Sequence, residues 1–407
     1  MTKPLAPGPL AGLRVVDLTL MLSGPFGTGF LADLGADVVK VEPPAGDPTR
    51  GNAFAPGDTL RAYGGYFQSI NRGKRSVAVD LKSERGREVL RRLATGADVL
   101  VENYKAGVME RLGLGYEELH ALNPKLVYAC IRGFGDPRTG ESPYAQWPAF
   151  DVVAQAMSGF MSMTGPGPGQ PMKSGASVGD LIPGMAMSLG ILAAVHHAQR
   201  TGEGQFVDVG MYDVLFAFCE QIVYRYSYMG EVTEPSGNGH PFLCPFDAFP
   251  ASDGWVAIAA PLDHLWQQLC QAMGREDLLS DPELVRPQDR AKNAPKVRAA
   301  VSAWTSQRTR VEIGALLGGK VPFGPVQNVT DIFADPHAAV REMIVELEQP
   351  GLDRPVHVTG SPIRMTVTPT GPRGRAPLLS EHADAILGEA GYAPDEIAAL
   401  RESGAIR

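Results

Sequence analysis

Residues 13–42 have the sequence LRVVDLTLMLSGPFGTGFLADLGADVVKVE and alternate between two local patterns. Leu13–Leu18 is a compact apolar run typical of a buried strand, and Val38–Val41 is a second strand rich in β-branched residues. Between them we expect a turn at Gly24–Gly29 and a short helix that continues from Phe30. Strand–helix–strand order predicts a parallel sheet with right-handed crossovers.

The same alternation continues through the first half of the chain. Further strands are predicted at Ser76–Val79, Val99–Val101 and Leu126–Ile131. Ser83 is placed to cap a helix whose apolar residues recur at helical spacing, and Gly96 is placed to end it. We therefore predict an α/β fold with a large Rossmann-like domain.

The second half of the chain differs from the first in composition and in predicted secondary structure. Aromatic residues, prolines and glycines crowd together in Tyr224–Pro250, followed by a strand at Gly254–Ala260 and helices with charged faces. Strand character returns at Val356–Val367 and helix character at Glu381–Glu402. We predict a parallel sheet built from N- and C-terminal parts in a large domain of residues 1–226 and 336–407, and a smaller α+β domain of residues 227–335.

Composition narrows the class of partner. The 407 residues carry a formal net charge of −8, which argues against nucleic acid or an anionic membrane surface as the main partner. The N-terminus lacks the apolar segment of a signal peptide. The longest apolar run, Leu181–Val195, is shorter than the roughly 20 residues needed to span a bilayer and is predicted to be a buried helix. We expect a cytoplasmic protein.

Metal and disulfide motifs are not evident in the sequence. The four cysteines are far apart and form no C-x-x-C pair. His196 and His197 are adjacent, so on a helix they diverge by about 100° and cannot share one ligand face. No metal site is predicted.

Asp180 is the best candidate for a reactive group. It ends the glycine-rich segment 174–179 and opens the apolar run at Leu181, which places it at a helix N-terminus. It is either a helix cap or a nucleophile. An unperturbed aspartate is already ionised at pH 7, so a catalytic site would have to supply positioning and backbone N–H donors.

Two other motifs have the wrong context for their usual chemistry. Residues 175–179 match the G-x-S-x-G of hydrolases, but the proline-rich segment 164–171 before them cannot be a central strand. Residues 24–29 are spaced G-x-x-G-x-G, whereas a dinucleotide fingerprint is G-x-G-x-x-G. No nicotinamide cofactor is predicted.

A set of short motifs recurs in order along nearly the whole chain. They are residues 10–17 (LAGLRVVD), 34–42 (LGADVVKVE), 46–47 (GD), 71–76 (NRGKRS), 79–82 (VDLK), 97–103 (ADVLVEN), 179–180 (GD), 201–209 (TGEGQFVDV) and 377–382 (PLLSEH). Together they resemble the class III (CaiB/BaiF-type) coenzyme A transferases. The resemblance implies an interlocked homodimer that acts on an acyl-CoA and a carboxylic acid.

The resemblance also implies roles for individual residues. Asp180 would be the catalytic nucleophile, forming first an acyl anhydride and then an aspartyl-CoA thioester. Gly237 and Gly239 would lie in a loop that closes over the site, with His240 beside it. CoA contacts would fall at Leu22, Ser23, Val79, Leu81, Lys82, Asn103, Tyr104, Arg111 and Phe150, with Trp147 nearby.

Three alternatives within this resemblance differ at identifiable positions. The related α-methylacyl-CoA racemases carry a histidine where this chain has Phe150, and phenylalanine cannot accept a proton. An inactive CoA-binding subunit would not need Asp180. The formyl-CoA/oxalate branch carries polar residues where this chain has Leu20 and Leu22, so a larger acyl group is expected here. Arg225 would then either bind a second carboxylate, as in succinyl-CoA, or form a structural ion pair.

Overall fold

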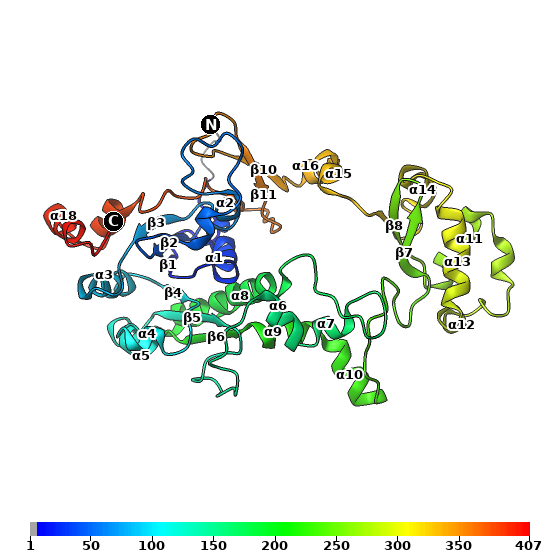
Figure 1. The fold of residues 1–407 in the computed structure, drawn as a ribbon, viewed down its shortest axis with the longest axis horizontal. Coiled ribbons are helices and arrows are strands. Elements are labelled where there is room, and N and C mark those ends of the chain that lie inside the picture. The colour runs from blue at the N-terminus through cyan, green and yellow to red at the C-terminus, as the bar shows by residue number, and fades with distance from the viewer. Residues whose placement is uncertain (1–5) are drawn as a thin grey trace. The chain divides into compact units, whose positions relative to one another are not determined.

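The computed structural model describes residues 6–407 (Figure 1). The chain forms two compact units. The large unit contains residues up to 160, 174–223 and 336–407, and the small unit contains residues 161–173 and 224–335.

A six-stranded parallel sheet forms the centre of the large unit, with the strand order β3-β2-β1-β4-β5-β6. This order is that of a Rossmann fold, in which ligands bind at the carboxyl ends of the strands where the order reverses, here between β1 and β4. The predicted α/β class and Rossmann-like domain are therefore confirmed. The strands are β1 (Arg14–Asp17), β2 (Asp37–Glu42), β3 (Arg75–Ala78), β4 (Val99–Glu102), β5 (Val127–Arg132) and β6 (Phe206–Gly210).

The C-terminal part of the chain joins the large unit in a way that differs from the prediction in one detail. It adds no parallel strand, and only Ile406 forms an isolated antiparallel bridge, with Val79. Strands β10 (Ile344–Leu347) and β11 (Val356–Thr359) make a separate antiparallel pair. Helices α17 (Ala383–Glu389) and α18 (Pro394–Glu402) bury apolar residues against the same core as the sheet.

Helix α1 (Ser23–Asp33) runs through the glycine-rich segment for which a turn is predicted, so that prediction is wrong. The reason is tertiary packing against α8 (Val178–Thr201). A Cβ on Gly27 would lie 2.4 Å from the carbonyl oxygen of Gly184, and a Cβ on Gly184 would lie 2.4 Å from that of Ser23. The two helices therefore meet backbone to backbone, which fixes the start of α8 beside the start of α1.

Helix α8 is longer than the predicted apolar run, with 24 residues. Among the helices of residues 6–407, it alone is long and apolar enough to cross a membrane by length and composition. Core helices can share these properties, and Met187, Ile191 and Val195 of α8 are buried in the core with residues of the sheet.

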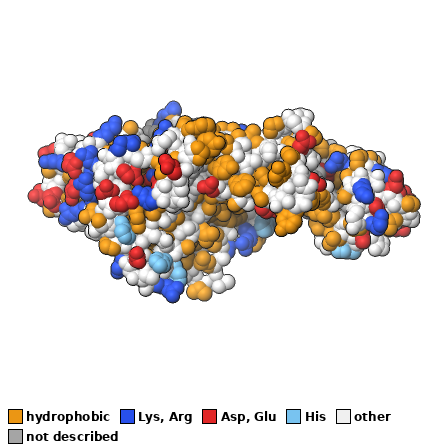
Figure 2. All heavy atoms as spheres, turned by 90° about the horizontal axis from the view of Figure 1, so that it is seen from below, with side chains coloured by type: hydrophobic (Ala, Val, Ile, Leu, Met, Phe, Trp, Pro, Cys, Tyr) orange, Lys and Arg blue, Asp and Glu red, His pale blue; other side chains and the backbone are white. Residues whose placement is uncertain are grey.

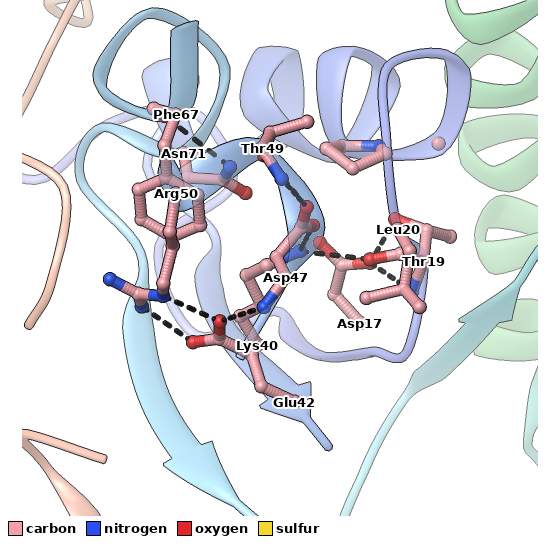
Figure 3. Close-up of polar contacts among 12 residues, drawn as sticks. Asp17, Thr19, Leu20, Lys40, Glu42, Asp47, Thr49, Arg50, Phe67 and Asn71 are labelled. Carbon is pink, nitrogen blue, oxygen red and sulfur yellow. Dashed lines mark hydrogen bonds and ion pairs between the residues drawn. The ribbon is translucent and has the colours of Figure 1, made fainter. Parts of the chain in front are cut away.

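A buried polar network lies at the carboxyl ends of β1 and β2 (Figure 3). Lys74 Nζ lies 3.0 Å from Asp17 Oδ2, and Lys40 Nζ lies 3.0 Å from Asp47 Oδ2. Lys40 also donates to the backbone carbonyl of Thr19 at 2.8 Å. Burial by itself would raise the pKa of Asp17, but the charges of Lys74 and Lys40, together with hydrogen bonds from Thr19 and Thr28, more than offset it and lower this pKa to about 2. The network holds the chain as it leaves β1.

The small unit contains an antiparallel sheet of β7 (Phe246–Ala251), β8 (Gly254–Ala259) and β9 (Phe323–Pro325), with helices packed on it. It also includes residues 161–173, which the sequence-based boundaries assign to the large domain. The backbone N–H of Gly237 donates to the carbonyl of Gly165 at 2.9 Å, which ties that segment to the small unit.

The other helices complete the two units. Ser83 accepts a hydrogen bond from the backbone N–H of Gly86 at the start of α3, and Gly96 ends that helix, as predicted. The predicted C-terminal helix is broken at Gly391, where φ is +84°. The remaining helices are α2 (Gly65–Asn71), α3 (Glu84–Thr95), α4 (Val108–Arg111), α5 (Tyr116–Leu122), α6 (Asp151–Met157), α7 (Phe160–Met163), α9 (Met211–Phe218), α10 (Glu220–Met229), α11 (Asp263–Met273), α12 (Pro287–Lys292), α13 (Ala294–Thr305), α14 (Arg310–Leu317), α15 (Val329–Ala334) and α16 (Pro336–Val340).

The helix crossing predicts opposite effects for two glycine-to-alanine changes. Gly184→Ala places a methyl group against backbone and should lower the free energy of unfolding by roughly 1–3 kcal/mol. Gly388→Ala, in α17 with no atom within 4 Å, should leave it unchanged or raise it by up to about 1 kcal/mol. Thermal unfolding of both variants checks this. Equal midpoints would contradict the proposed tight crossing.

Candidate active site

A cavity of about 270 Å³ opens at the carboxyl edge of the large unit's sheet. Its wall combines residues that follow β1, β4 and β5 with residues from the first turns of α1 and α8. This is the position at which the Rossmann strand order reverses. The cavity lining includes Leu20, Met21, Ser23, Asn103, Tyr104, Lys105, Arg132, Trp147, Phe150 and Asp180.

Asp180 occupies the third position of α8, and its side chain does not cap the helix. Among the described residues, its carboxylate has neither a hydrogen bond nor an ion pair. Burial, and then the negative charge of Asp151, raise the pKa of Asp180 from 3.8 to about 7. Asp180 therefore departs from an unperturbed aspartate, because the fold removes solvent from it without supplying a cation.

Asp151, at the start of α6, holds the first turn of α8 in place. Its Oδ1 accepts a hydrogen bond from the backbone N–H of Gly179 at 2.8 Å, and its two oxygens accept from Nε2 of Gln155 at 2.8 and 2.9 Å. A Cβ on Gly179 would lie 2.5 Å from the Asp151 carbonyl oxygen, so this contact requires glycine.

The first-turn amides of α8 are therefore all engaged. Val178 donates to Ala176 at 2.8 Å, and Asp180 and Leu181 donate to Ser177 at 3.0 and 2.9 Å. The N–H donors expected for a developing oxyanion must come from a different segment.

Tyr66 of α2 is an electrostatic neighbour of Asp180, although no sequence motif marks it. Its pKa is raised by burial and then by the charges of Asp180 and Asp47, so its hydroxyl lies within electrostatic reach of the Asp180 carboxylate. Only the folded arrangement of α2 and α8 reveals this neighbour.

Four of the residues expected to contact CoA line the cavity with Asp180, namely Ser23, Asn103, Tyr104 and Phe150, and Trp147 joins them. Burial, followed by the charge of Glu102, raises the pKa of Tyr104 to about 12, so this side chain is a neutral phenol.

The other expected CoA contacts lie outside the cavity lining. Leu22 is the half-buried N-cap residue of α1, and Val79 is only 1 % exposed within the core. Leu81 packs against that core, whereas Lys82 and Arg111 are exposed. Their contact with CoA stays a prediction.

The residues expected in a loop over the site belong to the small unit. Gly237 has a φ of +70°, and His240 accepts a hydrogen bond through Nδ1 from the N–H of Phe242 at 3.1 Å. Gly239 approaches the guanidinium of Arg298. Arg225 pairs with Glu231 at 2.9 Å, which is the structural alternative for this residue. Closure of Gly237, Gly239 and His240 over Asp180 stays a prediction.

No group of three or more His, Cys, Asp or Glu side chains within residues 6–407 is arranged to hold a metal ion.

Comparison with known proteins identifies the family. The family model for CoA-transferase family III matches residues 10–383. The succinyl-CoA:mesaconate CoA-transferase of Haloarcula hispanica is 51% identical over 386 residues, which cover 94% of this chain and 97% of that protein. The acetyl-CoA:oxalate CoA-transferase of Acetobacter aceti is 40% identical over 366 residues, which cover 88% and 92%.

A solved structure agrees with these relatives. A CaiB/BaiF family protein from Brucella suis superposes with a TM-score of 0.84 at 35% identity, covering 95% of this chain and 100% of that one. The chain thus belongs to CoA-transferase family III. It is an acyl-CoA:carboxylate CoA-transferase.

The raised pKa predicts a pH-dependent stability difference. The folded protein keeps a proton on Asp180 up to about pH 7, whereas the unfolded chain releases it near 3.8. The wild type should therefore lose stability relative to Asp180→Asn as the pH rises from about 4 to about 7, with a constant difference above that. Thermal midpoints of both proteins across this range measure the effect. Asp353→Asn, at an exposed carboxylate, is the control, and a difference that does not vary with pH would contradict the burial of Asp180.

Proposed function

We propose that the protein transfers CoA from succinyl-CoA to a short dicarboxylic acid, mesaconate foremost, with Asp180 as the covalent nucleophile. The observation that carries this proposal is the unpaired carboxylate of Asp180 in the cavity at the switch point of the sheet. The substrates follow from the relative that is 51% identical, whose name gives succinyl-CoA as donor and mesaconate as acceptor.

The first half of the reaction loads CoA onto the enzyme. An oxygen of Asp180 attacks the thioester carbonyl carbon of succinyl-CoA, the C–S bond breaks, and CoA thiolate leaves with its electron pair. The thiolate then attacks the aspartyl carbonyl carbon of the mixed anhydride. Succinate departs with the bridging oxygen, and an aspartyl-CoA thioester remains.

The second half reverses these steps with the acceptor acid. An acceptor carboxylate oxygen attacks the aspartyl carbonyl, and CoA thiolate leaves again. The thiolate attacks the carbonyl carbon that belongs to the acceptor, which releases the Asp180 carboxylate and the new acyl-CoA. No water, oxidant or metal enters the balance.

The surroundings of Asp180 suit a carboxylate that must attack. No ion pair among the described residues has to be broken before it reacts. A desolvated anhydride is also protected from hydrolysis, which would end the transfer. Burial, and then the charge of Asp151, raise the pKa of Asp180 to about 7, so the reactive carboxylate form is accessible near neutral pH.

The cavity offers one cation for a phosphate or carboxylate of the substrates. Arg132 is engaged by Glu102 and Asp136, so its charge is already balanced. Lys105 is exposed at the cavity wall and has no ion pair within the described part of the chain. We assign it to an anionic group of the acyl-CoA.

The cavity does not favour racemase chemistry. Phe150, which is 64% exposed and lines the wall, stands where a second proton-transfer group would be needed. An inactive CoA-binding subunit is disfavoured because Asp180 is present and unpaired.

We further propose a cytoplasmic homodimer. Figure 2 shows apolar side chains among polar ones on the surface in view. In the large unit, α8 and α9 expose Leu189, which is 70% exposed, together with Met185 and Phe218. Large exposed apolar groups of this kind mark protein contacts.

A donor and acceptor panel tests the proposed activity. The wild type should form mesaconyl-CoA from succinyl-CoA faster than it uses acetyl-CoA or oxalate, and Asp180→Ala should lose at least about 1000-fold in kcat. Chromatography of the acyl-CoA products provides the measurement. An Asp180→Ala variant that keeps full activity would contradict the covalent role, and loss of α-deuterium from a 2-methylacyl-CoA without acceptor would indicate a racemase.

The pH profile tests the state of Asp180 during the reaction. A protonated carboxyl is a poor nucleophile, so kcat/KM for the donor should rise about tenfold per pH unit below the pKa of about 7 and level off above it. Asp151→Asn removes the neighbouring charge and should move the midpoint to lower pH. A midpoint that does not respond to this change would assign the titration to another group.

A further inference from the structure

Met21 adopts a backbone conformation that few side chains favour. Its φ is +68°, in the left-handed region, in the turn that joins β1 to α1. Met21 is 39% exposed and lines the cavity that contains Asp180. Such conformations persist where neighbouring groups enforce them, and they cluster at ligand sites.

The side chain of Asn103 forms two hydrogen bonds with Leu20, the residue just before Met21. Its Oδ1 accepts a hydrogen bond from the backbone N–H of Leu20 at 2.9 Å, and its Nδ2 donates to the carbonyl of the same residue at 2.8 Å. Both polar atoms of the amide are therefore engaged with a single backbone unit. Asn103 itself directly follows β4, so its hydrogen bonds connect Leu20 to the central sheet.

The chain is also held in place on either side of Leu20 and Met21. Thr19 donates its backbone N–H to Asp17 Oδ1 at 2.9 Å, and its carbonyl accepts from buried Lys40 at 2.8 Å (Figure 3). On the other side, α1 begins at Ser23 and is held against α8. Met21 must connect two fixed segments, which accounts for its left-handed conformation.

The hydrogen bonds between Asn103 and Leu20 also set the direction of the backbone N–H of Met21. In a trans peptide the C=O and the following N–H point in opposite directions, so the Leu20 carbonyl that faces Asn103 turns the N–H of Met21 away from it. Within the part of the chain that the structure describes, this N–H has no acceptor.

We propose that Asn103 is a positioning residue that holds Met21 in its left-handed conformation and so fixes the cavity wall that Met21 shares with Asp180. The proposal rests on the proposed transfer reaction, and it replaces the CoA contact expected for Asn103 from the sequence. Both polar atoms of the Asn103 amide bond to Leu20, so this side chain shapes the cavity wall.

Four variants separate the two roles of Asn103. Asn103→Ala should lower kcat for CoA transfer about 10- to 100-fold, because small displacements at a reacting centre have effects of this size, while the Kd for free CoA changes less than about threefold. Adding Met21→Gly should restore at least about fivefold in kcat, since glycine adopts positive φ without steric conflict. Adding Met21→Ala instead, which removes the side chain but keeps the conflict, should restore nothing. Met21→Gly alone is the reference for the double variant, since adding Asn103→Ala to it should lower kcat far less than Asn103→Ala lowers it in the wild type.

The opposite pattern overturns the proposal. If Asn103→Ala weakens CoA binding in step with the loss of kcat and Met21→Gly restores nothing, Asn103 contacts CoA directly. If Asn103→Ala does not fold, Asn103→Asp, which keeps the acceptor for the Leu20 N–H but loses the donor, should show a smaller loss with the same rescue by Met21→Gly, and no rescue overturns the proposal.

Failure of the proposed function is recognised separately. In that case the wild type itself transfers no CoA from succinyl-CoA to a short dicarboxylic acid, and the effect of the Asn103–Leu20 hydrogen bonds is measured by thermal unfolding. Asn103→Ala should then lower the midpoint, and only the Met21→Gly addition should restore it. A midpoint that neither changes with Asn103→Ala nor recovers with Met21→Gly overturns the positioning role.

Discussion

Backbone contact between α1 and α8 is the constraint on which the site depends. Gly27 and Gly184 leave no room for a side chain at the crossing, so the two helix starts are held together. Asp180, one turn before Gly184, is thereby placed on the same cavity wall as Ser23 at the carboxyl edge of the sheet. The glycines have a packing role here, although their spacing resembles a nucleotide-binding loop.

Two aspartates of the large unit have opposite pKa shifts, and the difference matches a structural role for one and a reactive role for the other. Asp17 is fully buried but is paired with Lys74 and lies within reach of the charge of Lys40, and its pKa falls to about 2. Asp180 is partly buried without a cation among the described residues, and its pKa rises to about 7. The first carboxylate stabilises the turn after β1. The second is kept in an unfavourable environment, as expected for a group whose purpose is to react.

Sequence patterns predict those features that depend on neighbouring residues. Strands β1 to β5 of the parallel sheet, the Ser83 cap and the position of Asp180 at a helix start are local features and were predicted, whereas β6 was not. The course of α1 was not, because packing against α8 overrides the weak helix propensity of its glycines. Tyr66 and the raised pKa of Asp180 depend on segments that meet only in the fold, and so does the engagement of Asn103 with Leu20.

The central claim is that an oxygen of Asp180 enters and leaves the substrates, and isotope transfer tests it most directly. A single turnover of succinyl-CoA with an acceptor acid labelled with ¹⁸O in its carboxylates should leave one ¹⁸O in the Asp180 side chain, because the bridging oxygen of the second anhydride originates in the acceptor. Mass spectrometry of the peptide that contains Asp180 reads this directly. Full formation of the acyl-CoA product with an unlabelled Asp180 would contradict the account.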